Sequence, residues 1–388
     1  MEGSISNPST PPPKTLPFTY PILITWKASF RSFATTLFGI FSLVQMSRAL
    51  DASVRESLKH GDHRAVFDEI STVLTEPSDE RLEIELLGKS HVLDPNEIVL
   101  RDGNAIAIPK LRLVQAFMVA HKIFMSYMKD SSTVSTDEIL RSTAVILLMD
   151  PEHLTAANTR KRVIGKRLEG ENENVKEILR TEKHFMDSLL TSRLHRHTKS
   201  PTLWNHRRWL MDQFRLHELD VPTEDDVTKI IMISGERHPR NYYAWCHARY
   251  LINTFITPSP KMNEVLPRLV TATQKWCFTH HDDISGWQFL LFLLDKRPPT
   301  ETSPIFRETL KLAASFKWRN ESVWYFLRHM AAWGSTNDDL DEFELVRRTL
   351  WESAPEDGFE QLTLQRAEKW LSASQGLTII DAGLEEMP

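Results

Sequence analysis

The sequence predicts an all-α protein built as a right-handed solenoid of helical hairpins, a crescent-shaped alpha-alpha superhelix. Three observations favour this class. The 388 residues include only 13 glycines, as is typical of helix-rich chains. A tryptophan-centred motif recurs about every forty residues, which is the period of helical-hairpin repeats. The segments between its copies lack the strand alternation and glycine-rich turns of propeller blades.

Bulk properties narrow the function classes. The formal net charge is -5 and the pI is near 6.3, whereas a generic nucleic-acid binder carries a basic surplus. The two cysteines, Cys246 and Cys277, belong to no CxxC pair and suit a reducing cytosol. We therefore expect a cytoplasmic protein that does not bind nucleic acid.

The N-terminal segment differs from the rest. Residues 1–45 begin with a proline-rich stretch, followed by an apolar segment whose uncharged run, 32–45, has only 14 residues. A membrane span needs about 20, so no stable span is expected. Three interpretations remain open: an amphipathic targeting segment, a signal anchor, or an extension that the mature protein does not use. We favour the last, with 46–388 as a single helical repeat domain.

Aligning the tryptophans reveals the repeat. SPTLWNHRRWL, residues 200–210, lies over NYYAWCHARYL, residues 241–251. The shared positions are Trp204 with Trp245, His206 with His247, Arg208 with Arg249, Trp209 with Tyr250, and Leu210 with Leu251. Two later copies supply Trp287, and Asn320 with Trp324 and Arg328; a weaker first copy has Asn158 and Arg162.

Each repeat is predicted to contain two helices, of which the second carries the tryptophan. Ser135 and Glu138 form a possible capping box for one first helix, and Ser303 before Pro304 indicates the start of another. A capping residue stands four before each tryptophan: Ser200, Asn241, Asp283 and Asn320.

The recurring tryptophan most simply fills the seam between neighbouring hairpins. Tryptophan and arginine are four residues apart, so they share one helix face. We expect the arginine at the edge of the seam, its guanidinium available to a carboxylate or carbonyl of the stack or of a partner.

This pattern resembles the repeat of protein prenyltransferase alpha subunits. PRNYYAWCHARYLI, residues 239–252, is the clearest copy, and the resemblance covers about 135–333. It is most like the divergent repeat-containing branch, which supplies the alpha subunit of the type III geranylgeranyltransferase. The resemblance implies a helical crescent around a separate beta subunit that carries the catalytic zinc and the isoprenoid pocket.

The resemblance also implies a few cleft residues on this chain. Lys199, five before Trp204, matches a lysine that contacts the isoprenoid diphosphate, and Tyr242 and Tyr243 match two residues near the same group. The family usually has histidine at the place of Tyr243, and Ser200–Pro201 replaces an Asn-Tyr pair. The first departure leaves the donor role of Tyr243 open, and the second removes one cleft tyrosine.

The residues themselves indicate no metal site on this chain. Cys277 and His280 have a two-ligand spacing, but we favour a capped turn over a zinc site at 280–283. Basic residues precede two repeat helices at corresponding positions and would form a positive edge, unless they are only solvated loop charges. They are Arg193, Arg196 and Lys199, then Arg237, His238 and Arg240.

The resulting functional prediction is the alpha subunit of a heterodimeric protein prenyltransferase. It would support transfer of a geranylgeranyl or other isoprenoid group from its diphosphate to a C-terminal cysteine of a protein substrate, and the chain alone would be inactive. The main alternative is a helical-repeat scaffold that binds a protein or peptide partner without catalysis. A single-stranded RNA binder is disfavoured by the net charge.

Overall fold

The computed structural model describes residues 58, 63–78, 80–88, 97–170, 174–257, 260–333, 336–356 and 358–384, with side chains to residue 374. The segment predicted as an extension, 1–45, lies outside the described residues. Asp62–Pro388 form one compact unit. Among the described helices, none is both long and apolar enough to cross a membrane.

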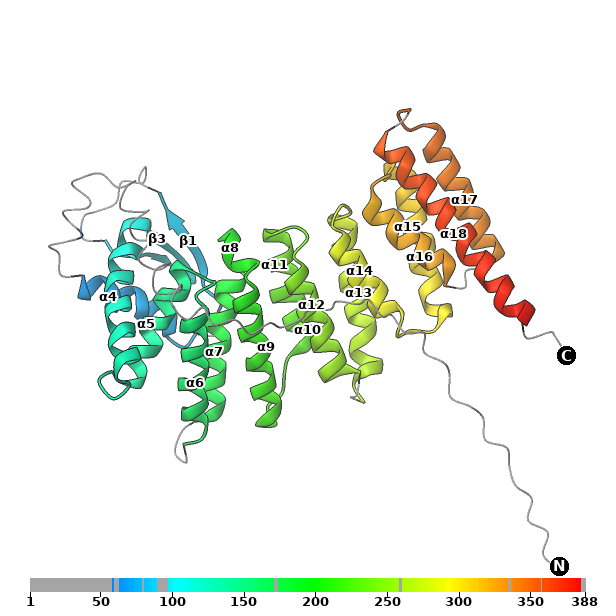
Figure 1. Cartoon of the computed structure of the whole chain (residues 1–388). Coiled ribbons are helices and arrows are strands. Elements are labelled where there is room, and N and C mark those ends of the chain that lie inside the picture. The colour runs from blue at the N-terminus through cyan, green and yellow to red at the C-terminus, as the bar shows by residue number, and fades with distance from the viewer. Residues whose placement is uncertain are drawn as a thin grey trace, which may run out of the picture. The chain divides into compact units, whose positions relative to one another are not determined.

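The predicted helical-repeat class is confirmed. Helices follow one another in chain order, and each pair packs on the next (Figure 1). The first part contains α3 (Arg64–Thr75), α4 (Lys110–Lys129), α5 (Thr136–Met149), α6 (Leu154–Leu168), α7 (Val175–Leu190), the short α8 (His195–Thr198) and α9 (Pro201–Leu216).

The second part continues in the same way. It contains α10 (Thr223–Asp225), π-helix η1 (Asp226–Ile231), α11 (Met232–Arg237), α12 (Tyr242–Leu251), π-helix η2 (Ile252–Ile256), α13 (Met262–Thr279), α14 (Ile284–Leu294), α15 (Pro299–Phe316), α16 (Glu321–Ala332), α17 (Asn337–Glu352) and α18 (Phe359–Leu384). The tryptophan-bearing helices are neighbours: α9 packs on α12, α12 on α14, and α14 on α16.

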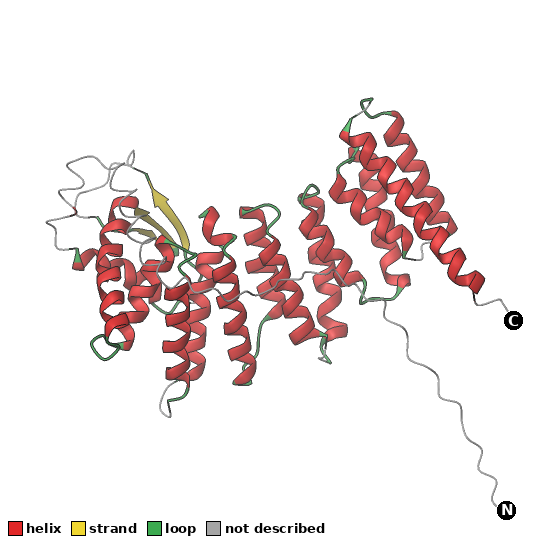
Figure 2. Ribbon diagram, in the orientation of Figure 1, coloured by secondary structure: helices red, strands yellow, loops and turns green. Residues whose placement is uncertain are grey.

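The sequence analysis did not predict a small sheet next to α4. Strand β3 (Ala105–Pro109) pairs in parallel with β1 (Glu83–Leu87) and antiparallel with β2 (Leu100–Asp102), so the strand order is β1-β3-β2 (Figure 2). The buried side chains Ile84, Ile106 and Ile108 join the sheet to the core. Strand β1 also packs against α7, so the sheet lies on a repeat helix.

The four predicted cap residues of the second helices are confirmed. Ser200, Asn241, Asp283 and Asn320 each accept a hydrogen bond from a backbone N–H in the first turn of their helix. These side chains supply acceptors that the first helical turn lacks within its own backbone.

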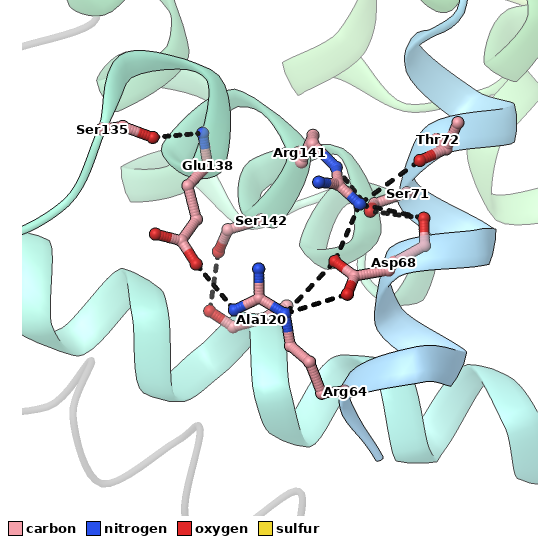
Figure 3. Close-up of polar contacts among 9 residues, drawn as sticks. All are labelled: Arg64, Asp68, Ser71, Thr72, Ala120, Ser135, Glu138, Arg141 and Ser142. Atoms are coloured by element: carbon pink, nitrogen blue, oxygen red, sulfur yellow. Dashed lines mark hydrogen bonds and ion pairs between the residues drawn. The ribbon is translucent and has the colours of Figure 1, made fainter.

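Two predictions for the first helices need correction. Ser135 Oγ accepts from Glu138 N at 3.2 Å, but the Glu138 carboxylate lies 2.7 Å from Arg64 Nη1 of α3, so no full capping box forms (Figure 3). Arg141 of α5 also binds Asp68 of α3, at 2.9 Å, and these pairs dock α3 on α5. Helix α15 begins at Pro299, so Ser303 lies inside the helix and does not cap it. Ser303 Oγ donates to Asp339 of α17.

A glycine allows the close approach of α13 and α14. A Cβ atom at Gly286 would overlap the indole carbons Cζ3 and Cε3 of Trp276. That indole stacks on His280, with ring centroids 4.2 Å apart, and meets Trp245 edge-on at 4.9 Å. Since His280 and Trp245 both pack against the indole, it has little room to yield to an extra methyl group.

We expect Gly286→Ala to lower the free energy of unfolding by about 1–3 kcal/mol, because the methyl group overpacks this contact. Urea denaturation followed by circular dichroism measures the effect. Gly165→Ala in α6 is the control, since no neighbouring atom lies within 4 Å of its Cβ position; it should stabilise by up to about 1 kcal/mol. Equal effects of the two substitutions would contradict the packing argument.

Candidate functional site

Four tryptophans occupy equivalent places in successive hairpins. Each belongs to the second helix of its hairpin and is at most 4% exposed. The four are Trp204 of α9, Trp245 of α12, Trp287 of α14 and Trp324 of α16. Their rings lie in the core between neighbouring helices, where each indole removes about 150–250 Å² of surface from water.

Three of these indoles also hold the loop before their own helix. Their Nε1 atoms donate to the backbone carbonyl six residues earlier, at 2.8–3.0 Å: Trp204 to Thr198, Trp287 to His281, and Trp324 to Trp318. Trp245 departs from this pattern, because its Nε1 has no hydrogen-bond partner among the described residues. The recurring tryptophan therefore fixes a loop as well as a seam.

The capping residues link one repeat to the next. Asn241 caps α12 and also donates through Nδ2 to the Thr198 carbonyl, at 2.7 Å. That carbonyl also accepts from Trp204, so one oxygen receives donors from two consecutive repeats. Asn320 is similarly linked to His281 of the preceding repeat, at 3.0 Å.

The predicted cleft residues lie beside this link. Lys199 follows Thr198 and Tyr242 follows Asn241, so the hydrogen bond between Asn241 and Thr198 brings both to one edge of the stack. Lys199 is exposed, and Tyr242 and Tyr243 are 65% and 37% exposed. The two phenol rings meet edge-on, with centroids 5.7 Å apart.

Tyr242 is a hydrogen-bond donor at neutral pH. A hydrogen bond to Cys246, one turn along α12, raises the pKa of its phenol, and a coulombic effect of Cys246 adds to this. The proton therefore stays on the phenol at neutral pH, and donating it to an anion at this edge would replace the hydrogen bond to Cys246.

The repeat arginines lie over aromatic rings of neighbouring tryptophan-bearing helices or of α18. Their guanidinium carbons stand 4.3–5.7 Å from ring centroids: Arg208 over Tyr250, Arg249 over Phe292, and Arg328 over Trp370. Arg208 is exposed, whereas Arg328 is buried and pairs with Glu321 at 2.7 Å. These arrangements favour cation–π contact between successive repeats.

The position two residues after the tryptophan, or after Asn158 in the first repeat, changes character along the stack. It is always buried, and holds Arg160, His206 and His247 in the first three repeats but Phe289 and Phe326 in the last two. The two phenylalanines pack against the tryptophans Trp245 and Trp287 of the preceding repeats, with centroids 5.1 and 4.9 Å apart. The seam is therefore ionic at α6–α12 and aromatic at α12–α16.

The sequence analysis missed the centre of the ionic part, Arg207. This side chain has no exposed surface, and its Nε donates to Asp187 Oδ1 at 2.8 Å. Its Nη2 lies 2.9 Å from Asp226 Oδ1, and its Nη1 donates to His247 Nε2 at 2.7 Å. Lys183 Nζ bridges the same two carboxylates, at 2.6 and 2.7 Å.

A second buried group, also missed, surrounds Glu182 of α7. Arg160 Nη2 lies 2.7 Å from Glu182 Oε2, and His206 Nε2 lies 2.6 Å from Glu182 Oε1. Arg160 is oriented further by the Leu140 carbonyl, which its Nη1 reaches at 2.6 Å. Predicted residue His206 is therefore a structural partner of a carboxylate inside the stack.

The charges of both groups are fixed by their neighbours. Burial alone would raise the pKa of Glu182, but Arg160 and His206 outweigh it and lower that pKa to about 2. Burial is likewise outweighed at Asp187, where Arg207 and Lys183 lower the pKa to about 2. Burial and the Arg207 charge hold the pKa of His247 well below its usual value, so its imidazole is neutral and accepts a hydrogen bond.

The predicted basic edge is partly neutralised by the chain itself. Arg237 Nη2 lies 2.6 Å from Glu83, and Arg193 lies 3.3 Å from Glu85, both carboxylates being on β1. Arg196 pairs with Asp150 at 2.8 Å. The unpredicted sheet therefore supplies acidic partners for an edge that the sequence indicated as positive.

The residues considered for a metal have other contacts. His280 stacks on Trp276, and His281 stacks on Trp318 with centroids 4.9 Å apart. Asp283 caps α14, and its Oδ2 accepts from Arg240 N at 2.6 Å. In the described part of the chain, no three His, Cys, Asp or Glu side chains are grouped so that they could hold a metal ion.

The fold and the seam define a helical-repeat protein whose second helices carry a buried tryptophan. A family model described as "Protein prenyltransferase alpha subunit repeat" matches residues 186–214, and one described as "ECM9 middle domain" matches residues 203–316. Residues 186–214 are thus similar to a prenyltransferase alpha subunit repeat.

Two curated proteins are also similar to this chain. "Protein ECM9" of Saccharomyces cerevisiae is 27% identical over 213 residues, 54% of each chain. The human "Protein prenyltransferase alpha subunit repeat-containing protein 1" is 27% identical over 192 residues, 45% of this chain and 44% of the relative. The chain spans about half the length of the curated relatives it matches.

A solved structure is also similar to this chain. The "Candida albicans protein geranylgeranyltransferase-I complexed with GGPP" matches with a TM-score of 0.44 and 14% sequence identity. The match covers 68% of this chain and 78% of that chain.

We expect Arg207→Met to lower the free energy of unfolding by about 3–5 kcal/mol, because it leaves Asp187 and Asp226 buried with only Lys183 as a cation. Chemical denaturation measures this loss. Arg208→Met is the matched control on the adjacent, exposed arginine, and should cost less than about 1 kcal/mol. Similar losses in the two variants would show that the ionic group is not critical for stability.

A pH dependence follows from His197, which is buried against α5. Burial lowers its pKa to about 4, although its Nε2 lies within 3.1 Å of the Leu147 and Leu148 carbonyls. Between about pH 6.5 and this value, the unfolded chain binds a proton that the folded chain does not. The contribution of the neutral His197 side chain to the free energy of unfolding is therefore complete above about pH 6.5. It falls, by at most about 3 kcal/mol, as the pH is lowered to about 4.

His197→Gln keeps an amide donor for the carbonyls but cannot titrate. The free energy of unfolding of this variant should depend less on pH between 6.5 and 4 than that of the wild type, by up to about 1.4 kcal/mol per pH unit. Denaturation series at several pH values provide the comparison, with His217→Gln as the control. An unchanged slope in His197→Gln would exclude His197 as a source of the pH dependence.

Proposed function

We propose that this protein is the alpha subunit of a heterodimeric protein prenyltransferase. It would stabilise a catalytic beta subunit and support transfer of a geranylgeranyl or other isoprenoid group from its diphosphate to a C-terminal cysteine of a protein substrate. The zinc and the isoprenoid pocket are assigned to the partner, as the family resemblance implies.

The observation that carries this proposal is the placement of Lys199. It lies within the matched repeat, 186–214, and the hydrogen bond between Asn241 and Thr198 brings it to the same edge as Tyr242. An ammonium group and a phenol at one edge suit the departing diphosphate, whose negative charge grows as the bond to the isoprenoid breaks.

Tyr243 would take a secondary part in the site. It lies next to Tyr242 at the start of α12 and is less exposed. Its phenol can donate one hydrogen bond, as an imidazole at this place could, but it cannot carry a positive charge at neutral pH. We therefore assign charge neutralisation to Lys199 and hydrogen bonding to the two tyrosines.

The scaffold alternative is favoured by a different observation. The exposed Arg208 and the half-buried Arg249 lie over aromatic rings on the tryptophan-bearing helices, whereas Arg328 of the same row is buried. Aromatic and arginine side chains are enriched in protein interfaces. A stable heterodimer that transferred no isoprenoid to any cysteine-ended substrate would support the scaffold and refute the enzyme.

Co-expression with candidate beta subunits, followed by an isoprenoid-transfer assay on a cysteine-ended protein, tests the proposal. Lys199→Ala should slow transfer by about 10-fold to 100-fold, because one stabilising cation is lost in the transition state. The heterodimer should elute unchanged in size-exclusion chromatography. Lys229→Ala is the control, since Lys229 lies on η1 and pairs with Asp225. Unchanged turnover in Lys199→Ala would remove Lys199 from the site.

A further inference from the structure

Two histidines from successive hairpins meet beside Lys199. His195 of α8 and His238, which follows α11, approach with their Nδ1 atoms 3.0 Å apart. Their rings are nearly perpendicular, with centroids 5.2 Å apart. At this distance one Nδ1 donates a hydrogen bond and the other accepts it, so the two imidazoles hold opposite tautomers at this nitrogen.

The charges around this pair do not cancel completely. The arginines Arg193, Arg196 and Arg237 are each paired with a carboxylate, Glu85, Asp150 and Glu83 respectively. In the described part of the chain, the side chains of Lys199 and Arg240 have neither a hydrogen bond nor an ion pair. The positive surplus of the edge is thus concentrated next to the histidine pair.

Two helix N-termini reinforce this surplus. Lys199 directly precedes Ser200, the cap of the 16-residue α9, and His238 lies three residues before Asn241, the cap of the 10-residue α12. The N-terminal end of a helix carries a partial positive charge and free backbone N–H groups, which favour an anion.

His238 resists protonation while no anion is bound. Burial, and then the charges of Lys199 and His195, lower the pKa of His238. A bound anion would offset the repulsion from Lys199 and allow the pair to take up a proton from solvent.

We propose that His195, His238 and Lys199 form a phosphate-binding site that gains a proton as it binds. The inference rests on the proposed function, within which the ligand is the diphosphate of the isoprenoid substrate and His195 and His238 are further ligands of that group. Phosphate fits this chemistry because its second pKa, near 6, lies in the same range as that of imidazole.

Isothermal titration calorimetry of the full chain with inorganic pyrophosphate tests the site. Titrations at pH 7 in two buffers of different ionisation enthalpy give the number of protons taken up. We expect His195→Asn and His238→Asn, which keep an amide near Nδ1 but cannot titrate, to bind about 10-fold more weakly and to take up fewer protons. His217→Asn at the end of α9 is the control and should behave as the wild type. Thermal unfolding of each variant verifies that it is folded.

The outcomes separate this inference from the proposed function. If both histidine variants bind pyrophosphate as the wild type does, the phosphate site is refuted even when the heterodimer transfers isoprenoid. If binding is weakened in the variants but no beta subunit forms a heterodimer, the site stands and the prenyltransferase assignment fails. Orthophosphate binding as tight as that of pyrophosphate would overturn the assignment to a diphosphate.

Discussion

The candidate site depends on one backbone oxygen, the carbonyl of Thr198. It accepts from the Trp204 indole of its own repeat and from the Asn241 amide of the next repeat, at 2.8 and 2.7 Å. Ser234 of α11 also donates to this oxygen, at 3.2 Å, so side chains of α9, α11 and the α12 cap converge on one acceptor. The carbonyl therefore fixes the spacing of two hairpins at the point where Lys199 and Tyr242 emerge. The tryptophan that fills the seam and the proposed site residues Lys199 and Tyr242 are thus parts of one arrangement.

The edge that carries these residues has its charge adjusted by a distant segment. Strand β1 lies far from these arginines in the sequence, with 154 positions between Glu83 and Arg237, yet Glu83 and Glu85 neutralise Arg237 and Arg193. What remains uncompensated is Lys199, with Arg240 and the histidine pair nearby. A long row of basic residues would attract any polyanion, whereas this arrangement concentrates the positive charge at one place. The acidic net charge of the chain and a local anion site are therefore compatible.

Local signals in the sequence predicted the helical repeats, the cap residues and the buried tryptophans, because a cap and a helical spacing involve only a few neighbouring residues. The ionic group could not be predicted in this way, since Arg207 meets Asp187 and Asp226, each about twenty residues away on a different helix. A hint was present in Glu182 and Asp187, which interrupt the apolar face of α7. The sheet had a clearer signal: the alternation in EIELL and the turn at Asp102–Gly103, where Gly103 has a positive φ of 59°.

The seam changes from ionic to aromatic along the stack, so different hairpins carry different complementary side chains. His206 binds Glu182 within its own hairpin, whereas His247 meets Arg207 of the preceding hairpin, and Phe289 and Phe326 each meet an indole of the preceding hairpin. A hairpin moved to another place would bury a charge without its partner or leave a ring without its neighbour. Repeat arrays of uniform sequence can gain or lose a unit with little penalty, whereas inserting a unit between α9 and α12 of this protein would separate Arg207 from Asp226 and His247.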